Sequence, residues 1–288
     1  MTKIEIKTKD DYILRGRYFT ASEAKAVVMF NPGTATKSEF YYPFAEYLAS
    51  QGYHVFVWNY RGFSESKNGS LKNSPIRYSD IGYFDVPAVI ERLRSDYPDL
   101  PLYAIGHSAG GQQIGFPENH KRLDGIIAIG VSGGYPPYMP MSYRPKPEFL
   151  FRVFVPLSHL LFGYVRTKKF DLMEDLPTHF AKEWGDWCYE KNYFFSKKYY
   201  GVTIPEGTYK DLKIPVHVLV ADDEEISTQK NVEGFWSHVS SEKGVHIKIY
   251  KAADFPRKEI GHFGYFRKVN LKIWEDVVGI LRELKGNS

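Results

Sequence analysis

Ser108 lies at the centre of the run G-H-S-A-G at residues 106–110, which directly follows an apolar run at residues 102–105. A short apolar run that ends at a glycine is typical of a buried strand followed by a turn. Such a turn holds the serine in a strained backbone conformation between a strand and a helix. Glycines flank it because a Cβ would collide with neighbouring backbone. The run therefore predicts a nucleophile elbow, with the Ser108 hydroxyl at the edge of a sheet.

A serine hydroxyl is a weak nucleophile near neutral pH, so Ser108 needs a base to take its proton and an acid to hold that base. His262 lies in the run G-H-F-G, after the last expected strand, and Asp222 and Asp223 follow the strand expected at residues 215–220. Serine, aspartate and histidine thus occur in the chain order of one known type of catalytic triad. We expect Ser108 to be the nucleophile, His262 the base, and one of the two aspartates the acid.

Composition excludes several other classes of function. The formal net charge of the 288 residues is +4, and basic and acidic residues are interspersed, so no basic stripe indicates nucleic-acid binding. Cys188 is the single cysteine, which excludes an intrachain disulfide, and no pair of histidines has metal-ligand spacing. The first residues lack the apolar stretch of a signal peptide. We therefore expect a cytoplasmic protein that needs neither metal nor cofactor and is not stably inserted in a membrane.

Apolar runs alternate along the chain with segments that have apolar residues at helical spacing. Strands are expected at residues 4–8, 12–19, 26–30, 53–58, 102–105, 123–132, 215–220 and 246–250. Helices are expected after residue 38, at 79–97, from 110, at 228–239 and at 265–285. The first two strands alternate apolar and polar residues, which predicts an antiparallel pair, whereas the later runs are continuously apolar. This alternation predicts a mostly parallel sheet covered by helices on both faces.

Residues 135–205 differ in character, because strand-like runs disappear and prolines and aromatic residues become frequent. We interpret this segment as a helical cap inserted into an α/β core made of residues 1–134 and 206–288. Most of its aromatic residues would form a second small core. We expect Trp184 and Trp187, together with His107 of the elbow, to contact substrate; packing beneath the sheet edge is the alternative for His107.

The elbow, the run N-Y-R-G-F-S-E-S at residues 59–66, the aspartate pair and the Gly261-His262 pair together resemble the α/β-hydrolase fold enzymes. The chain is most similar to their serine aminopeptidase and monoacylglycerol-lipase-like group. The resemblance covers nearly the whole chain outside the cap. It implies an α/β-hydrolase fold with an eight-stranded sheet, an inserted helical cap and a carboxylate at Asp223, because the spacing from Asp223 to Ser227 matches the family.

An oxyanion hole needs two hydrogen-bond donors, each worth about 10²- to 10³-fold in rate. The backbone N–H of Ala109, at the start of the helix after the elbow, is expected to be one. Relatives usually carry His-Gly in the loop after the strand at residues 26–30, but this chain has N-P-G-T at residues 31–34. Pro32 has no N–H, so we expect the second donor to be the backbone N–H of Thr34.

These residues predict a serine hydrolase, a carboxylesterase, that cleaves esters with an apolar acyl or alcohol group through an acyl-enzyme at Ser108. The alternatives are an amide or peptide hydrolase, a thioesterase or acyltransferase, and a non-enzymatic ligand-binding protein. An aminopeptidase would need an acidic patch in the cap, for which Glu174, Asp175 and Glu183 are candidates. The apolar segment at residues 149–162 could be a pocket wall, a contact within a homodimer, or a lid that touches lipid.

Overall fold

The computed structural model describes residues 1–116, 118–170, 173–210 and 212–286. Within them lies a sheet of eight strands in the order β1-β2-β4-β3-β5-β6-β7-β8. The strands are β1 (Thr2–Lys7), β2 (Ile13–Phe19), β3 (Ala26–Asn31), β4 (Tyr53–Asn59), β5 (Leu102–His107), β6 (Gly125–Ile129), β7 (Val216–Ala221) and β8 (Val245–Tyr250). The first two strands pair antiparallel with each other, β2 pairs antiparallel with β4, and β3 to β8 run parallel. The predicted mostly parallel sheet is confirmed.

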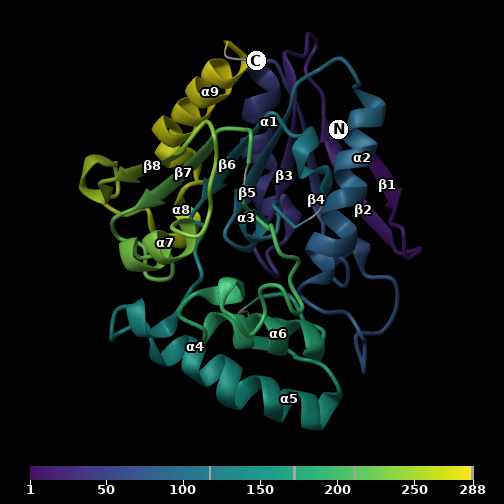
Figure 1. Ribbon diagram of the computed structural model, residues 1–288, viewed down its shortest axis with the longest axis vertical. Helices are drawn as coiled ribbons and strands as arrows, with labels where there is room; N and C mark the ends of the chain where they lie inside the picture. The colour runs from purple at the N-terminus through teal and green to yellow at the C-terminus, as the bar shows by residue number, and fades with distance from the viewer. Residues whose placement is uncertain (117, 171–172, 211, 287–288) are drawn as a thin grey trace.

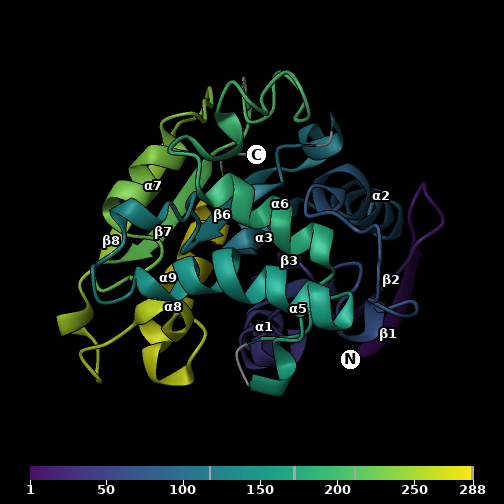
Figure 2. The same cartoon turned by 90° about the horizontal axis from the view of Figure 1, so that it is seen from below.

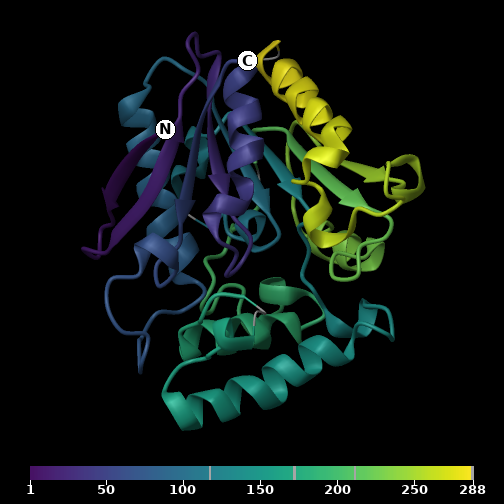
Figure 3. The ribbon, with the colours of Figure 1, turned by 180° about the vertical axis from the view of Figure 1, so that it is seen from behind.

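Helices cover both faces of the sheet (Figure 1), which explains why every residue of β3, β5 and β6 is buried. One face packs against α1 (Tyr42–Ser50) and α9 (Leu271–Gly286), both seen in front in Figure 3. The other face packs against α2 (Val86–Asp96) and α7 (Gln229–Trp236). The continuous apolar runs of the sequence therefore correspond to strands buried between two helical layers.

Three predicted helices differ in extent from those observed. The helix after the elbow, α3 (Ala109–Gln112), is a single turn, because the chain there contains consecutive glycines, which have low helix propensity. The helix expected at residues 79–97 begins with a π-helical turn (Ile81–Asp85), and α2 follows with Pro87 in its first turn, where proline is tolerated. The last long helix begins at Leu271, and a separate short helix, α8 (Gly261–Gly264), precedes it.

Residues 135–205, which we call the cap, connect β6 to β7 and lie beyond one end of the sheet (Figure 1). Their helices are α4 (Pro145–Phe149), α5 (Val155–Phe162) and α6 (Thr178–Cys188), with a π-helical turn (Leu150–Phe154) joining α4 to α5. Phe180 of α6 packs edge-on against Phe63 and Tyr78 of the core. The backbone N–H of Glu174 donates to the carbonyl oxygen of Ala35 at 3.0 Å, which ties the cap to the loop after β3.

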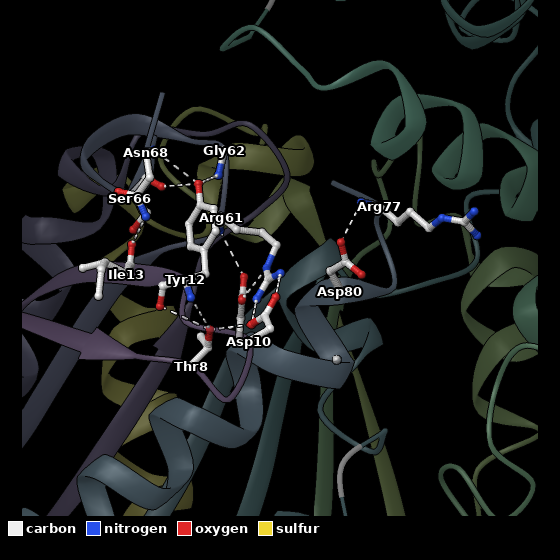
Figure 4. A network of polar contacts seen from close by, with 12 residues as sticks. Thr8, Asp10, Tyr12, Ile13, Arg61, Gly62, Ser66, Asn68, Arg77 and Asp80 are labelled. Atoms are coloured by element: carbon white, nitrogen blue, oxygen red, sulfur yellow. Dashed lines mark hydrogen bonds and ion pairs between the residues drawn. The ribbon is translucent and has the colours of Figure 1, made fainter. Parts of the chain in front are cut away.

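A buried arginine joins the first hairpin to the rest of the core (Figure 4). The Arg61 guanidinium, only 3% exposed, bonds the Asp10 carboxylate at 2.8 and 3.0 Å and the fully buried Asp85 carboxylate at 2.7 Å. Tyr12, whose ring lies 4.9 Å from the guanidinium carbon, accepts at its hydroxyl from the N–H of Gly62. Two carboxylates therefore compensate the buried positive charge, and the loop after β4 is held against the hairpin.

Candidate active site

The backbone around Ser108 has the strained form expected of an elbow. Ser108 adopts φ 51° and ψ −122°, a left-handed conformation that is costly for a residue with a Cβ. A Cβ added to Gly106 would lie 2.5 Å from the backbone of Gly111, and one added to Gly110 would lie 2.1 Å from the carbonyl oxygen of Asn31. Both glycines are therefore required by close packing of backbone against backbone.

His262 is presented by α8, in the segment after β8, and its side chain is 12% exposed. Its Nδ1 bonds the two carboxylate oxygens of Glu224 at 3.0 and 3.1 Å. The Glu224 side chain is fully buried, and its Oε1 also accepts a hydrogen bond of 2.8 Å from the Tyr265 hydroxyl, which itself accepts from the N–H of Ala221. Glu224 is thus fixed in place and holds the His262 ring by its Nδ1.

The prediction that Asp223 bonds His262 is wrong. The Asp223 carboxylate instead accepts from the backbone N–H groups of Ile260 at 2.8 Å and Gly261 at 3.0 Å. The alternative, Asp222, accepts from the N–H of Ala252 at 2.8 Å. The two aspartates follow β7 directly and are occupied by the backbone of the segment that carries His262. The longer side chain of Glu224, one residue further on, reaches the imidazole.

His107 lies under the site and connects its parts. Its ring is fully buried, with Nε2 bonded at 2.8 Å to the carbonyl oxygen of His262 and Nδ1 at 2.8 Å to the Tyr41 hydroxyl. A carbonyl only accepts, so Nε2 carries the proton. Burial holds the pKa of His107 well below its ordinary value, so Nδ1 is unprotonated and accepts from Tyr41. The Tyr41 hydroxyl in turn accepts from the N–H of Gly33 at 2.9 Å.

These bonds link the loop after β3 to the segment that carries His262, through Tyr41 and His107. Tyr41→Phe keeps the packing and removes the linking hydroxyl. We therefore expect kcat for ester hydrolysis to fall about tenfold, with KM little changed. This fall is smaller than the one that removal of an oxyanion donor causes. Steady-state kinetics would measure both constants. Tyr53→Phe, at a buried tyrosine of the same core face, is the control. Equal kcat in the two variants would contradict the linking role.

Of the two predicted oxyanion donors, Ala109 belongs to the elbow and Thr34 to the loop after β3. Ala109 is the first residue of α3, where a backbone N–H has no intrahelical acceptor, and in the described part of the chain the N–H of Thr34 donates to no other group. The loop before Thr34 is fixed, because the Tyr60 hydroxyl donates to the carbonyl oxygen of Pro32 at 2.8 Å. The Asn31 side-chain amide donates to the carbonyl oxygen of Gly110 at 3.0 Å. Their role as oxyanion donors stays a prediction.

A cavity of about 780 Å³ lies between the cap and the carboxyl ends of the strands. Ser108, His262 and Thr34 line it from the core, and cap residues that include Met139, Leu150, Phe151, Phe154 and Trp184 line it from the other side. Within the described residues no hydrogen bond joins Ser108 to His262. Such a bond between nucleophile and base often forms only when substrate is bound. Ser108 and His262 nevertheless line one largely apolar space.

Of the three predicted substrate contacts, Trp184 and His107 line the cavity, and their contact with substrate stays a prediction. Trp187 is 1% exposed and does not line the cavity. Because it lies three residues after Trp184 on α6, it is turned by about 60° around the helix. Its ring packs against Tyr78 and Phe194, with centroids at 5.2 and 5.4 Å. His107 borders the cavity, but both its nitrogens are bonded within the protein, so it has no polar group to offer substrate.

Charged side chains at the cavity are mainly basic. Lys37, Lys146 and Lys168 line it, with Glu174 as the acidic residue of the cap among the lining residues. Glu183, a second candidate for an acidic patch, accepts from the backbone N–H of Ser79 at 2.8 Å. The described residues hold no cluster of three or more histidine, cysteine, aspartate or glutamate side chains that could bind a metal ion. Among the described residues that line the cavity, Glu174 is therefore the one carboxylate that could meet a substrate ammonium group.

Comparisons by sequence place residues 22–182 in the family described as serine aminopeptidase, S33. An uncharacterized protein, YfhR, from Escherichia coli K12 is 24% identical over 149 residues, which make up 50% of this chain and 51% of that protein. The same protein from E. coli O157:H7 matches to the same extent. The chain thus spans about half the length of the curated relatives it matches.

Solved structures resemble the whole chain. A soluble variant of monoglyceride lipase from Saccharomyces cerevisiae, in complex with a substrate analog, has a TM-score of 0.69 at 15% identity, over 99% of this chain and 96% of that one. A thermostable carboxyl esterase from Bacillus coagulans has a TM-score of 0.63 at 13% identity, over 99% of this chain and 98% of that one. The Pyrococcus furiosus esterase Pf2001 has a TM-score of 0.62 at 17% identity, over 98% of this chain and 92% of that one. With the family match over more than half of its length and this fold, the chain belongs to the serine aminopeptidase family S33 of α/β-hydrolases.

Proposed function

We propose that the protein is a serine hydrolase that cleaves carboxylic esters with an apolar acyl or alcohol group, with Ser108 as nucleophile, His262 as base and Glu224 as acid. The observation that carries this proposal is the bond from His262 to the buried Glu224, beside a cavity that also contains the strained Ser108. Nucleophile, base and orienting carboxylate come from the segments after β5, β8 and β7. This is the chain order of the α/β-hydrolase triad, with glutamate as its acid.

In the proposed reaction, the Ser108 Oγ attacks the ester carbonyl carbon while His262 Nε2 takes the hydroxyl proton. Glu224 holds Nδ1–H, which fixes the tautomer that leaves Nε2 free to accept, and its negative charge stabilises the imidazolium that forms. Collapse of the tetrahedral intermediate breaks the bond to the alcohol oxygen, which receives the proton from Nε2. Water, deprotonated by the same nitrogen, then attacks the acyl-enzyme and releases the acid with Ser108 restored.

The oxyanion that develops on the carbonyl oxygen would be held by the N–H groups of Ala109 and Thr34. Neither group moves far during the reaction, because one begins α3 and the other follows a loop fixed by Tyr60. Preorganised donors of this kind need no reorientation as charge develops, which makes them effective in a site that excludes water.

Apolar aromatic and aliphatic walls support an apolar substrate group, since burying each CH₂ contributes about 0.8 kcal/mol. The basic residues Lys37, Lys146 and Lys168 at the cavity disfavour the aminopeptidase alternative, because a substrate ammonium would meet like charge there. A pure binding protein would have no need of the backbone strain at Ser108 or of the paired His262 and Glu224.

Hydrolysis of p-nitrophenyl esters from acetate to decanoate tests the substrate class. We expect kcat/KM to rise with chain length by roughly fourfold per CH₂ until the cavity is filled, because each added CH₂ leaves water. Aminoacyl p-nitroanilides should be cleaved far more slowly. A profile that falls with chain length, or faster turnover of the anilides than of any ester, would contradict the proposal.

A further inference from the structure

The outer edge of the cap is one continuous helical stretch, residues 145–162, made of α4, the π-helical turn and α5 (Figure 1). Its inner side faces the rest of the protein: Phe151 and Phe154 line the cavity, and Val155 is buried. Figure 2, seen from below, shows this helix lying in front of α6, with no other segment of the described chain drawn in front of it. A surface helix normally presents polar residues on such a side.

The outer side is instead apolar. Val153, Leu157, Leu160 and Leu161 lie four, three and one residues apart and are 49%, 52%, 79% and 63% exposed; we call these four residues the outer apolar face. Large exposed apolar side chains are common singly, but a continuous stripe along a helix marks a surface that contacts an apolar medium or a partner. The helix is thus apolar on two opposite sides, of which the protein covers one.

The chain segment that contains the outer apolar face is strongly basic. Residues 141–169 contain six basic side chains, Arg144, Lys146, Arg152, Arg166, Lys168 and Lys169, and one acidic side chain, Glu148. The net charge of this segment is therefore +5, whereas the whole chain has +4, so the remaining residues sum to −1. The segment that carries the outer apolar face therefore holds the excess positive charge of the protein, and within it Lys146 and Lys168 line the cavity while Arg144, Arg152, Arg166 and Lys169 do not.

We propose that the outer apolar face, together with Arg144, Arg152, Arg166 and Lys169, binds the surface of a lipid bilayer that contains anionic lipids. An apolar stripe flanked by lysine and arginine is the pattern of a helix that lies in the plane of a membrane interface, with its apolar side among the acyl chains and its basic residues near the headgroups. Among the described residues no helix has the length and apolar character to cross a membrane, which is consistent with binding at the surface.

Charge favours a lipid surface over a second copy of the chain as the binding partner of the outer apolar face. Two copies that met through this face would bring two segments of net charge +5 together, and like charges across an interface weaken association. An anionic surface complements the same charge. Because the opposite side of the helix lines the cavity, a bound protein would hold one wall of its active-site cavity next to the lipid.

The test is sedimentation with sucrose-loaded vesicles of phosphatidylcholine alone and of phosphatidylcholine mixed with phosphatidylglycerol, with Ser108→Ala protein so that no ester hydrolysis is involved. We expect partitioning to the anionic vesicles to be at least about tenfold stronger than to vesicles of phosphatidylcholine alone, and we expect added salt to weaken it. In the same background, Leu160→Glu with Leu161→Glu should lower that partitioning at least tenfold. Val202→Glu, at a 72% exposed cap residue off the helix, should not.

The basic residues are tested separately by Arg152→Gln with Lys169→Gln, which should lower partitioning to anionic vesicles several-fold, with Lys243→Gln and Lys251→Gln as the control pair outside the cap. The leucine variant should keep the thermal midpoint of unfolding. Partitioning that is equal for both vesicle types, or unaffected by the leucine substitutions, would overturn the proposal. Formation of a dimer that these substitutions dissociate would overturn it in favour of self-association. Failure of ester hydrolysis would leave this result unaffected.

Discussion

Replacing Glu224 with glutamine is expected to lower kcat for ester hydrolysis by about 10²- to 10⁴-fold, with KM nearly unchanged. Glutamine is close to isosteric with glutamate, but it has no negative charge to stabilise the imidazolium, and its amide can favour the wrong tautomer of His262. Steady-state kinetics with a soluble p-nitrophenyl ester would measure the effect. Because the carboxylate is fully buried and bonded at 3.0 Å, solvent should not replace it.

Asp223→Asn is the matched control for this substitution. It changes the neighbouring carboxylate, which bonds the backbone N–H groups of Ile260 and Gly261 and so positions the segment that carries His262. An asparagine oxygen can still accept from one of these groups, so we expect a loss of about tenfold or less. If Asp223→Asn were the more damaging of the two, the acid of the site would be Asp223 and the assignment of Glu224 would be wrong.

Ser108→Ala is expected to reduce ester hydrolysis by about 10⁴- to 10⁶-fold, since no other group in the site would form the acyl-enzyme. The residual rate would come from the oxyanion donors and from substrate binding. Alanine should also relieve little of the backbone strain at this position, because it keeps the Cβ that makes φ 51° costly. The thermal midpoint of unfolding should therefore change little, so lost activity reports lost chemistry. Retention of more than a hundredth of the activity would contradict nucleophilic catalysis by Ser108.

Much of the fold could be predicted from the sequence because its signals are local. Continuous apolar runs such as residues 26–30 require cover on both faces, which only a parallel sheet between helical layers supplies. The elbow was predictable for a similar reason: Gly106 and Gly110 have no room for a Cβ, so they mark a backbone arrangement and not only a sequence pattern. The short α3 was not predicted, because helix length depends on where the chain must turn to pack.

The carboxylate that bonds His262 shows where sequence patterns stop being sufficient. Asp222, Asp223 and Glu224 are consecutive, and family spacing favoured an aspartate. Which carboxylate reaches His262 depends on the path of the turn after β7 and on the length of each side chain. The carboxylates of Asp222 and Asp223 accept hydrogen bonds from backbone N–H groups of the segment after β8. Of the three carboxylates, only that of Glu224 bonds the imidazole. The same limit applies to Trp184 and Trp187, since composition does not tell which side of a cap helix faces a cavity.

The most direct test of the account is the rate at which a fluorophosphonate labels Ser108, followed by intact mass and peptide mapping, in the wild-type protein and in Glu224→Gln and Asp223→Asn. This measurement needs no knowledge of the natural substrate. We expect a single adduct on Ser108, formed at least tenfold more slowly in Glu224→Gln than in Asp223→Asn. An adduct at another residue, or equal labelling rates in the wild-type protein and Glu224→Gln, would contradict it.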